Sequence, residues 1–141
     1  GIFSGSALTH DVDMPRSEYS VESMKKTVVP NRNMVMISIA ASKAIQSKCH
    51  AIAYGAHAGD AEVYPDCRPD FAKKLGEAIA ICDWHNLQLV TPYIHMTKRD
   101  IYAKAKEFGF DVSKTWSCYV GGDEPCGWCG SCHSRQEAMA A

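Results

Sequence analysis

Two stretches of the chain place apolar residues three and four positions apart, the spacing of a helix with one buried face. This pattern predicts helices over residues 34–47 and 66–82, and start and stop signals predict a third helix over residues 97–109. Asn33 precedes the first helix and is expected to cap it, because its side-chain oxygen can accept a hydrogen bond from a main-chain N–H that lacks a helical partner. Gly109 is expected to end the third helix.

The start of the third predicted helix carries a further signal. Thr97 is followed three residues later by Asp100, which is close to the pattern of a capping box. Weaker patterns predict a short helix within residues 17–26 and a helical tail over residues 131–141.

Two short apolar runs, residues 49–54 and 87–90, alternate with these helices and indicate buried strands. Strands that alternate with helices predict an α/β fold with a parallel sheet. Residues 56–65 are polar and contain glycine and proline, so a loop is expected there. Two strands make a poor sheet alone, and the chain opens on Gly1 rather than a start methionine. We therefore expect the native polypeptide to continue upstream with further strands.

The composition excludes some classes of function. Hydrophobic residues make up 46% and charged residues 22% of the 141 residues, an ordinary balance for one globular domain. The formal net charge of -1 argues against a basic nucleic-acid-binding surface. No apolar run approaches the roughly 20 residues that span a bilayer, and no secretory signal opens the chain. We expect a cytoplasmic protein with no membrane partner and no direct nucleic-acid partner.

Seven cysteines are many for this length, and four of them form a metal-ligand pattern: Cys118, Cys126, Cys129 and Cys132. A Cys-x2-Cys turn brings two thiolates onto one ion, and zinc takes four ligands tetrahedrally. Four thiolates leave no coordination position for water, so the pattern predicts one structural Zn²⁺ per chain and a reducing compartment. An iron–sulfur cluster on the same thiolates is a lesser alternative, and His133 is an alternative ligand.

Polar side chains gather at two places where α/β sheets bind ligands. Arg32 lies between two amides at a predicted helix start, where anions are favoured, and guanidinium groups bind carboxylates or phosphates through paired hydrogen bonds. The loop after the first predicted strand occupies the sheet edge that binds ligands in open α/β folds. It carries His57, Asp60, Tyr64, Asp66 and Arg68. The alternative is a solvated surface, with Asp66 as the cap of the next helix.

Taken together, these motifs resemble the 7-cyano-7-deazaguanine synthase family of queuosine precursor biosynthesis. The resemblance rests on Val-Pro-Asn-Arg-Asn at residues 29–33, Tyr-Pro-Asp-Cys-Arg at 64–68, Thr-Pro at 91–92 before a lysine-containing helix start, and the four cysteines. It extends over nearly the whole chain and includes Leu-Thr-His-Asp at residues 8–11. Each motif alone is weak, but their order along the chain is specific.

The resemblance implies a fold, a reaction and a set of ligands. The fold is a partial adenine-nucleotide α-hydrolase-like, Rossmann-type parallel sheet with helices over residues 1–115, followed by a four-cysteine zinc-binding segment and a C-terminal helix over residues 116–141. The reaction is an ATP-dependent ligation, with Mg²⁺ accompanying ATP. Ammonia and 7-carboxy-7-deazaguanine yield 7-cyano-7-deazaguanine (preQ0) through an amide. The family also implies a homodimer.

Site residues carry over from the resemblance only at matching positions. The four cysteines carry over as zinc ligands. Six residues are placed near the deazaguanine or its activated carboxylate: Arg32, Asn33, Asp60, Tyr64, Asp66 and Arg68. Asp60 is the candidate partner of the guanine-like N–H donors, because a carboxylate can accept two parallel hydrogen bonds. No catalytic residue is assigned from the sequence.

One departure from the family pattern bears on activity. The family's ATP-binding loop, Ser-Gly-Gly-x-Asp-Ser, does not occur in this sequence, and the Ser-Gly-Ser at residues 4–6 does not match it. The resemblance therefore implies the C-terminal part of such an enzyme, inactive by itself, with the far C-terminus also missing. Two other functions remain open. One is a tRNA-thiolating ATP pyrophosphatase in which Cys67 takes part in sulfur transfer, and the other is a non-enzymatic zinc module that binds nucleic acid or protein.

Overall fold

The structure is a computed structural model that describes residues 5–9, 13–16 and 20–140. Within these residues no helix is both long enough and apolar enough to cross a bilayer. The predicted helical signal at residues 17–19 and the motif residues His10 and Asp11 lie outside the described residues.

The chain divides into two compact units. Residues 31–95 form one unit, and residues 1–30 together with residues 96–141 form the other. The boundary predicted between residues 115 and 116 divides the ligase part from the zinc-binding part by their expected functions. The two units above are divided by contacts between residues, so the predicted boundary stays a prediction.

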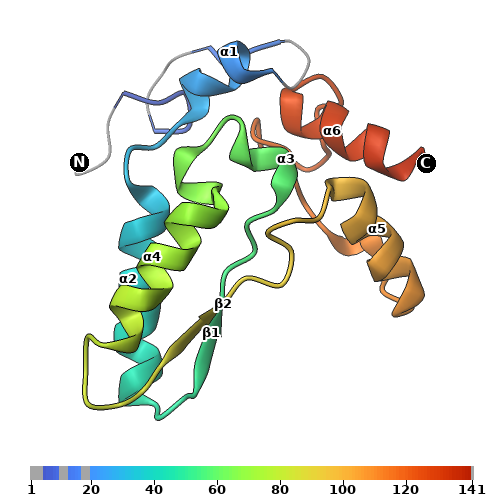
Figure 1. Ribbon diagram of the computed structural model, residues 1–141. Coiled ribbons are helices and arrows are strands. Elements are labelled where there is room, and N and C mark those ends of the chain that lie inside the picture. The colour runs from blue at the N-terminus through green and yellow to red at the C-terminus, as the bar shows by residue number, and fades with distance from the viewer. Residues whose placement is uncertain (1–4, 10–12, 17–19, 141) are drawn as a thin grey trace. The chain divides into compact units, whose positions relative to one another are not determined.

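Two parallel strands lie beside the two long helices of the unit formed by residues 31–95 (Figure 1). β1 spans Ala51–Ala53 and β2 spans Gln88–Val90, with Ile52 opposite Leu89. Parallel neighbours need a crossover connection, which here contains α4 (Pro69–Ala80). The predicted α/β class and parallel pairing are confirmed, although both strands are shorter than their apolar runs. The prediction of buried strands is wrong, because the first and last residues of each strand are exposed.

The core of this unit lies between the strands and two helices, α2 (Arg32–Gln46) and α4. Leu87, just before β2, has an exposed fraction of 0%. Its buried neighbours come from both helices: Ile37, Ala41, Ala44, Leu75 and Ile79. Gly76 brings α4 close to β2, since a Cβ added there would lie 3.5 Å from the Cβ of Leu89. The middle parts of the apolar faces predicted from helical spacing therefore form the core. Met34, Ala78 and Cys82, which share that spacing, are exposed.

The start of α2 differs from the prediction. The N-cap residue is Asn31, whose φ of 57° is left-handed, a conformation that asparagine tolerates better than most residues. The helix therefore begins at Arg32, and Asn33 lies inside its first turn. The prediction of Asn33 as N-cap is wrong, and its amide makes a tertiary contact instead.

The segment between β1 and α4 contains more helix than predicted. α3 spans Ala58–Ala61 within the expected loop, and a 3-10 helix spans Pro65–Cys67. α4 begins only at Pro69, because proline suits the first position of a helix and disrupts later ones. The N-cap of α4 is Arg68, so the alternative role of Asp66 as a helix cap is wrong.

Two longer helices pack together in the other unit: α5 (Lys98–Glu107) and α6 (Gly130–Met139) (Figure 1). The predicted capping box is confirmed. Thr97 Oγ1 accepts a hydrogen bond from the Asp100 N–H at 3.2 Å, and Asp100 Oδ2 accepts one from the Thr97 N–H at 2.8 Å. Gly109, with a φ of 67°, follows the end of α5 as predicted.

The same unit contains shorter elements. α1 spans Val21–Met24, which confirms part of the helix predicted within residues 17–26, and a 3-10 helix continues it over Lys25–Thr27. A further 3-10 helix spans Val112–Lys114 between α5 and the cysteine-rich segment.

Candidate functional site

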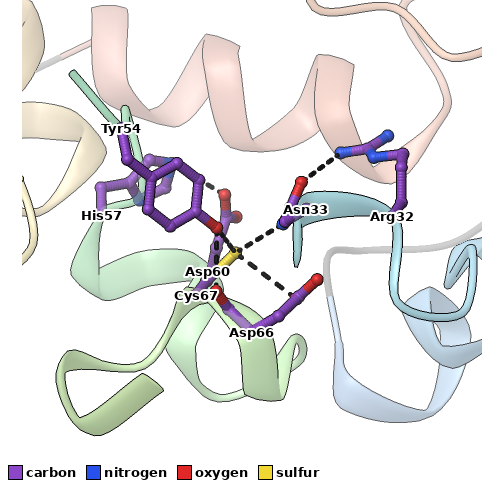
Figure 2. A network of polar contacts seen from close by, with 7 residues as sticks. All are labelled: Arg32, Asn33, Tyr54, His57, Asp60, Asp66 and Cys67. Atoms are coloured by element: carbon purple, nitrogen blue, oxygen red, sulfur yellow. Dashed lines mark hydrogen bonds and ion pairs between the residues drawn. The ribbon is translucent and has the colours of Figure 1, made fainter. Parts of the chain in front are cut away.

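Strand β1 leads directly into a polar cluster. Tyr54 follows the strand and donates its main-chain N–H to the Val90 carbonyl at 2.9 Å, so the sheet fixes its position. Its hydroxyl donates to the main-chain oxygen of Asp66 at 2.9 Å (Figure 2). This bond ties the end of the sheet to the 3-10 helix at Pro65–Cys67.

The sulfur of Cys67 lies at the centre of the cluster (Figure 2). It is 3.4 Å from Tyr54 Oη and 4.0 Å from Asp66 Oδ1, and it accepts a hydrogen bond from Asn33 Nδ2 at 3.7 Å. Arg32 in turn donates to Asn33 Oδ1 at 3.3 Å. We call these five residues the Cys67 cluster. It connects the start of α2, the end of β1 and the 3-10 helix that precedes α4.

Two acceptors compete for the hydrogen of the Tyr54 hydroxyl. It donates to the Asp66 main-chain oxygen at 2.9 Å. In the 3.4 Å contact between Tyr54 and Cys67, either the hydroxyl or the thiol can be the donor. The Cys67 thiol also has the Asp66 Oδ1 atom as an acceptor at 4.0 Å.

The electrostatics favour a protonated Cys67 thiol. Burial raises the pKa of the Cys67 thiol, and the carboxylates of Asp66 and Asp60 raise it further, against the opposing effects of the Tyr54 hydrogen bond and Arg32. Burial also raises the pKa of Tyr54, and the contact with Cys67 adds to the rise. Both side chains are therefore neutral at physiological pH.

Cys67 is expected to react with iodoacetamide at pH 8 at least about 10-fold more slowly than Cys49 and Cys82, because the thiolate is the reactive form. Cys49 and Cys82 are exposed, whereas Cys67 is buried and its pKa is raised. Timed alkylation of the folded chain, followed by peptide mass spectrometry, measures each rate. Equal rates for the three thiols would contradict the protonated, buried state of Cys67.

A second polar pair lies beside the Cys67 cluster. Asp60 Oδ2 is 3.2 Å from His57 Nε2, and the two side chains come from the first turn of α3 and the residue before it (Figure 2). The Asp60 side chain is 27% exposed, so its carboxylate remains accessible to a ligand. Its charge contributes to the raised pKa of both Tyr54 and Cys67.

The six residues predicted for substrate contact do not all meet. Arg32, Asn33 and Asp66 belong to the Cys67 cluster, and Asp60 lies beside it. Arg68 is exposed and donates from Nε to the Ala61 carbonyl at 3.0 Å, which braces α3. Tyr64 is not among the hydrogen-bonded residues of the Cys67 cluster, but it packs against an apolar group that includes Cys67 together with Ala56, Ala72 and Ile94.

Sequence reasoning missed the structural importance of Tyr54. It was interpreted only as the last residue of an apolar strand, and its hydroxyl partner lies 12 residues later in the chain. The one available signal is its position, because a residue that ends a parallel strand lies at the edge where α/β sheets place ligands.

A metal-binding arrangement lies in the C-terminal segment. The sulfur atoms of Cys118, Cys126, Cys129 and Cys132 all lie within 4.8 Å of one another. Cys126 Sγ and Cys132 Sγ are 3.9 Å apart. Two sulfurs at the vertices of a tetrahedron with metal–sulfur bonds of about 2.3 Å are separated by roughly 3.8 Å. The four cysteines can therefore hold one metal ion, and within the described residues His133 is not part of that group.

The protonation of these thiols also fits a cation site. Burial raises the pKa of Cys132, and its thiol neighbours Cys129 and Cys118 add to the rise. Burial acts to raise the pKa of Cys118 too, but hydrogen bonds from main-chain N–H groups, that of Cys126 first, lower it overall. Thiolates this close repel one another, so a divalent cation is needed to hold all four in the ionised form.

Side chains from the N-terminal part of the chain contact this segment. Met14 packs against the cysteine cluster. The guanidinium carbon of Arg16 lies 4.7 Å from the centroid of a Trp128 ring, a cation–π geometry. The surroundings of the cysteines are therefore built from both ends of the sequence.

Comparisons with known proteins agree with these features. A family model described as "Queuosine biosynthesis protein QueC" matches residues 1–141. The 7-cyano-7-deazaguanine synthase of Methanoregula boonei is 50% identical over 135 residues, which are 95% of this chain and 62% of that protein. The synthase of Pseudoalteromonas atlantica is 43% identical over 138 residues, which are 98% of this chain and 63% of that protein. The chain thus spans somewhat less than two thirds of the length of these relatives.

The parallel strands with a polar cluster at the end of β1, together with four converging cysteines, define an α/β protein with a C-terminal segment that can hold a metal ion. Within that class, the chain belongs to the queuosine biosynthesis protein QueC family.

Proposed function

We propose that this chain forms part of an ATP-dependent ligase that converts 7-carboxy-7-deazaguanine and ammonia to 7-cyano-7-deazaguanine. The observation that carries the proposal is the match of the family over residues 1–141, with relatives at 43% and 50% identity named for that synthase. The fold would be of the adenine-nucleotide α-hydrolase type. The family motif for ATP and Mg²⁺ does not occur in residues 1–141, so we assign none of these residues to the nucleotide.

The chemistry explains the need for ATP. A carboxylate is a poor electrophile until one oxygen becomes a good leaving group, and adenylation supplies that group. Ammonia then displaces AMP to give an amide, and a second activation removes the amide oxygen to give the nitrile. In this scheme Arg32 and Asn33 lie near the substrate carboxylate, and Asp60 accepts hydrogen bonds from the guanine-like N–H groups.

We further propose that the four cysteines hold zinc in a structural role. A complete set of thiolate ligands leaves no position for a reacting water, and the sulfur spacing suits the bond length of zinc. The ion would fix the start of α6, because Cys129 is the N-cap residue of that helix and Cys132 lies in its first turn. The remaining thiols favour a reducing compartment such as the cytoplasm. A homodimer is the expected assembly.

Sulfur transfer by Cys67 is less favoured. A persulfide carrier or thiol nucleophile works as the thiolate and must be accessible. Cys67 has an exposed fraction of 6% and a raised pKa, which oppose both requirements.

A hybrid protein tests the proposed reaction. Residues 1–141 would replace the matching part of the Methanoregula boonei synthase, and the parent protein serves as the positive control. We expect the hybrid to consume ATP and to form the amide and then the nitrile, each detected by mass spectrometry. A folded, zinc-loaded hybrid that forms neither product, while the parent forms both, would contradict the proposed function.

Within this hybrid, Asp60→Asn is expected to raise the KM for 7-carboxy-7-deazaguanine by about 10- to 100-fold, the value of hydrogen bonds to a charged group. The KM for ATP should stay constant. Asp70→Asn, at an exposed position in the first turn of α4, is the matched control. Initial rates at varied substrate concentration measure the effect, and an unchanged KM would remove Asp60 from the substrate site.

A further inference from the structure

One sulfur atom joins three elements that are distant in sequence. Asn33 is 34 positions from Cys67, and Tyr54 is 13 positions from it. Asn33 is carried by α2, Tyr54 follows β1, and Cys67 ends the 3-10 helix before α4. The placement of Arg32, Asn33 and Asp66 relative to one another therefore depends on contacts made by Cys67 and Tyr54.

The distances require an atom of sulfur's size. The contacts of Cys67 Sγ with Tyr54 and Asn33 are 3.4 Å and 3.7 Å. Hydrogen bonds between oxygen and nitrogen atoms extend to only about 3.2 Å. A serine oxygen at the same backbone position would be smaller and closer to its own Cβ, so it would fall short of both partners. We therefore expect Cys67→Ser to lose both contacts, as Cys67→Ala does.

We propose that Tyr54 and Cys67 are positioning residues that hold Arg32, Asn33 and Asp66 in the arrangement that receives the carboxylate-bearing deazaguanine. The Tyr54 hydroxyl fixes the main chain of Asp66 through its hydrogen bond to the Asp66 carbonyl. Cys67 Sγ orients the side-chain amide of Asn33 by accepting a hydrogen bond from it, and the oxygen of the same amide accepts a hydrogen bond from Arg32. The role in substrate binding rests on the proposed function, whereas the positioning itself rests on the contacts alone. Neither side chain takes part in bond making.

The inference predicts a selective kinetic effect in the hybrid described above. Tyr54→Phe removes one hydroxyl and is expected to raise the KM for 7-carboxy-7-deazaguanine by about 3- to 10-fold, the value of one neutral hydrogen bond. Cys67→Ala and Cys67→Ser should each raise it at least as much. The KM for ATP and kcat should change less than about threefold, because a positioning role involves contact with neither ATP nor the reacting atoms.

A double variant tests whether Tyr54 and Cys67 position the substrate residues together or act independently of each other. Cys67 and Tyr54 share one contact, so Tyr54→Phe combined with Cys67→Ala should raise KM by less than the product of the two single effects. Cys82→Ser at an exposed cysteine and Tyr93→Phe are matched controls. Within the described residues, no hydrogen bond of the Tyr93 hydroxyl is present, so its removal should leave KM unchanged.

A second readout does not depend on activity. In the zinc-loaded 141-residue chain, Tyr54→Phe should speed amide hydrogen exchange at residues 64–68, whereas Tyr93→Phe should not. Faster exchange combined with an inactive hybrid would refute the proposed function and leave the positioning intact. An active hybrid in which Tyr54→Phe and Cys67→Ala leave the substrate KM unchanged would overturn the inference. Complete loss of kcat in both Cys67 variants at constant KM would also overturn it, since that result identifies a reacting thiol.

Discussion

Replacing Cys129 by serine is expected to abolish tight metal binding and to unfold the segment that leads into α6. Cys129 has an exposed fraction of 1% and lies within 4.8 Å of the three other thiol groups. Structural zinc contributes about 10–16 kcal/mol to the folding of small zinc domains, and a hydroxyl is a poor replacement for a thiolate ligand. Native mass spectrometry should show one zinc per chain in the unmodified protein and none in the variant.

The control for this prediction is Cys82→Ser, at an exposed thiol remote in sequence from the four ligands. It should keep one zinc per chain and unchanged amide exchange over residues 116–139. A Cys129→Ser protein that retains a full zinc complement would refute the four-thiolate site. A mass for iron and sulfide in the unmodified protein would refute zinc itself. Zinc should also leave as the pH falls, because protons compete with the ion for each thiolate.

The second large effect is expected at the core of the unit formed by residues 31–95. Leu87→Ala should lower the free energy of unfolding by about 2–5 kcal/mol, the cost of a cavity at a buried leucine. Leu87 is fully buried among residues of α2 and α4. Because small domains are stable by only about 5–15 kcal/mol, this one change removes a large share of the total.

Urea denaturation of the zinc-loaded chain measures this loss. Ile81→Ala is the matched control, since Ile81 is 84% exposed just after α4 and its truncation should alter stability by less than about 0.5 kcal/mol. Equal losses in the two variants would show that Leu87 does not lie in a cooperative core.

The regular elements were predictable because their signals are local. Helical spacing located α2 and α4, and the pair Thr97 and Asp100 together with Gly109 located α5. The errors arose where two local preferences competed. At the start of α2, Asn31 and Asn33 are both good caps, and the left-handed φ of Asn31 decided the boundary. Before α4, Pro69 delayed the helix until after Asp66.

The two candidate sites differ in how far sequence could predict them. The four cysteines lie within 15 consecutive residues in a spacing that has few uses besides a metal, so their convergence was predictable. The Cys67 cluster depends on tertiary contacts between residues up to 34 positions apart. No local pattern states that the Tyr54 hydroxyl reaches the Asp66 carbonyl, and only the packing of α2 beside the sheet brings Asn33 to Cys67.

The contacts of Met14 and Arg16 with the cysteine segment have a consequence for the order of folding. Arg16 and Trp128 are far apart in sequence, so the contact between them closes a long loop. Such contacts form slowly, because the chain entropy is lost before the contact is gained. We therefore expect the full surroundings of the four cysteines to assemble late in refolding, even though the cysteines themselves lie within 15 consecutive residues.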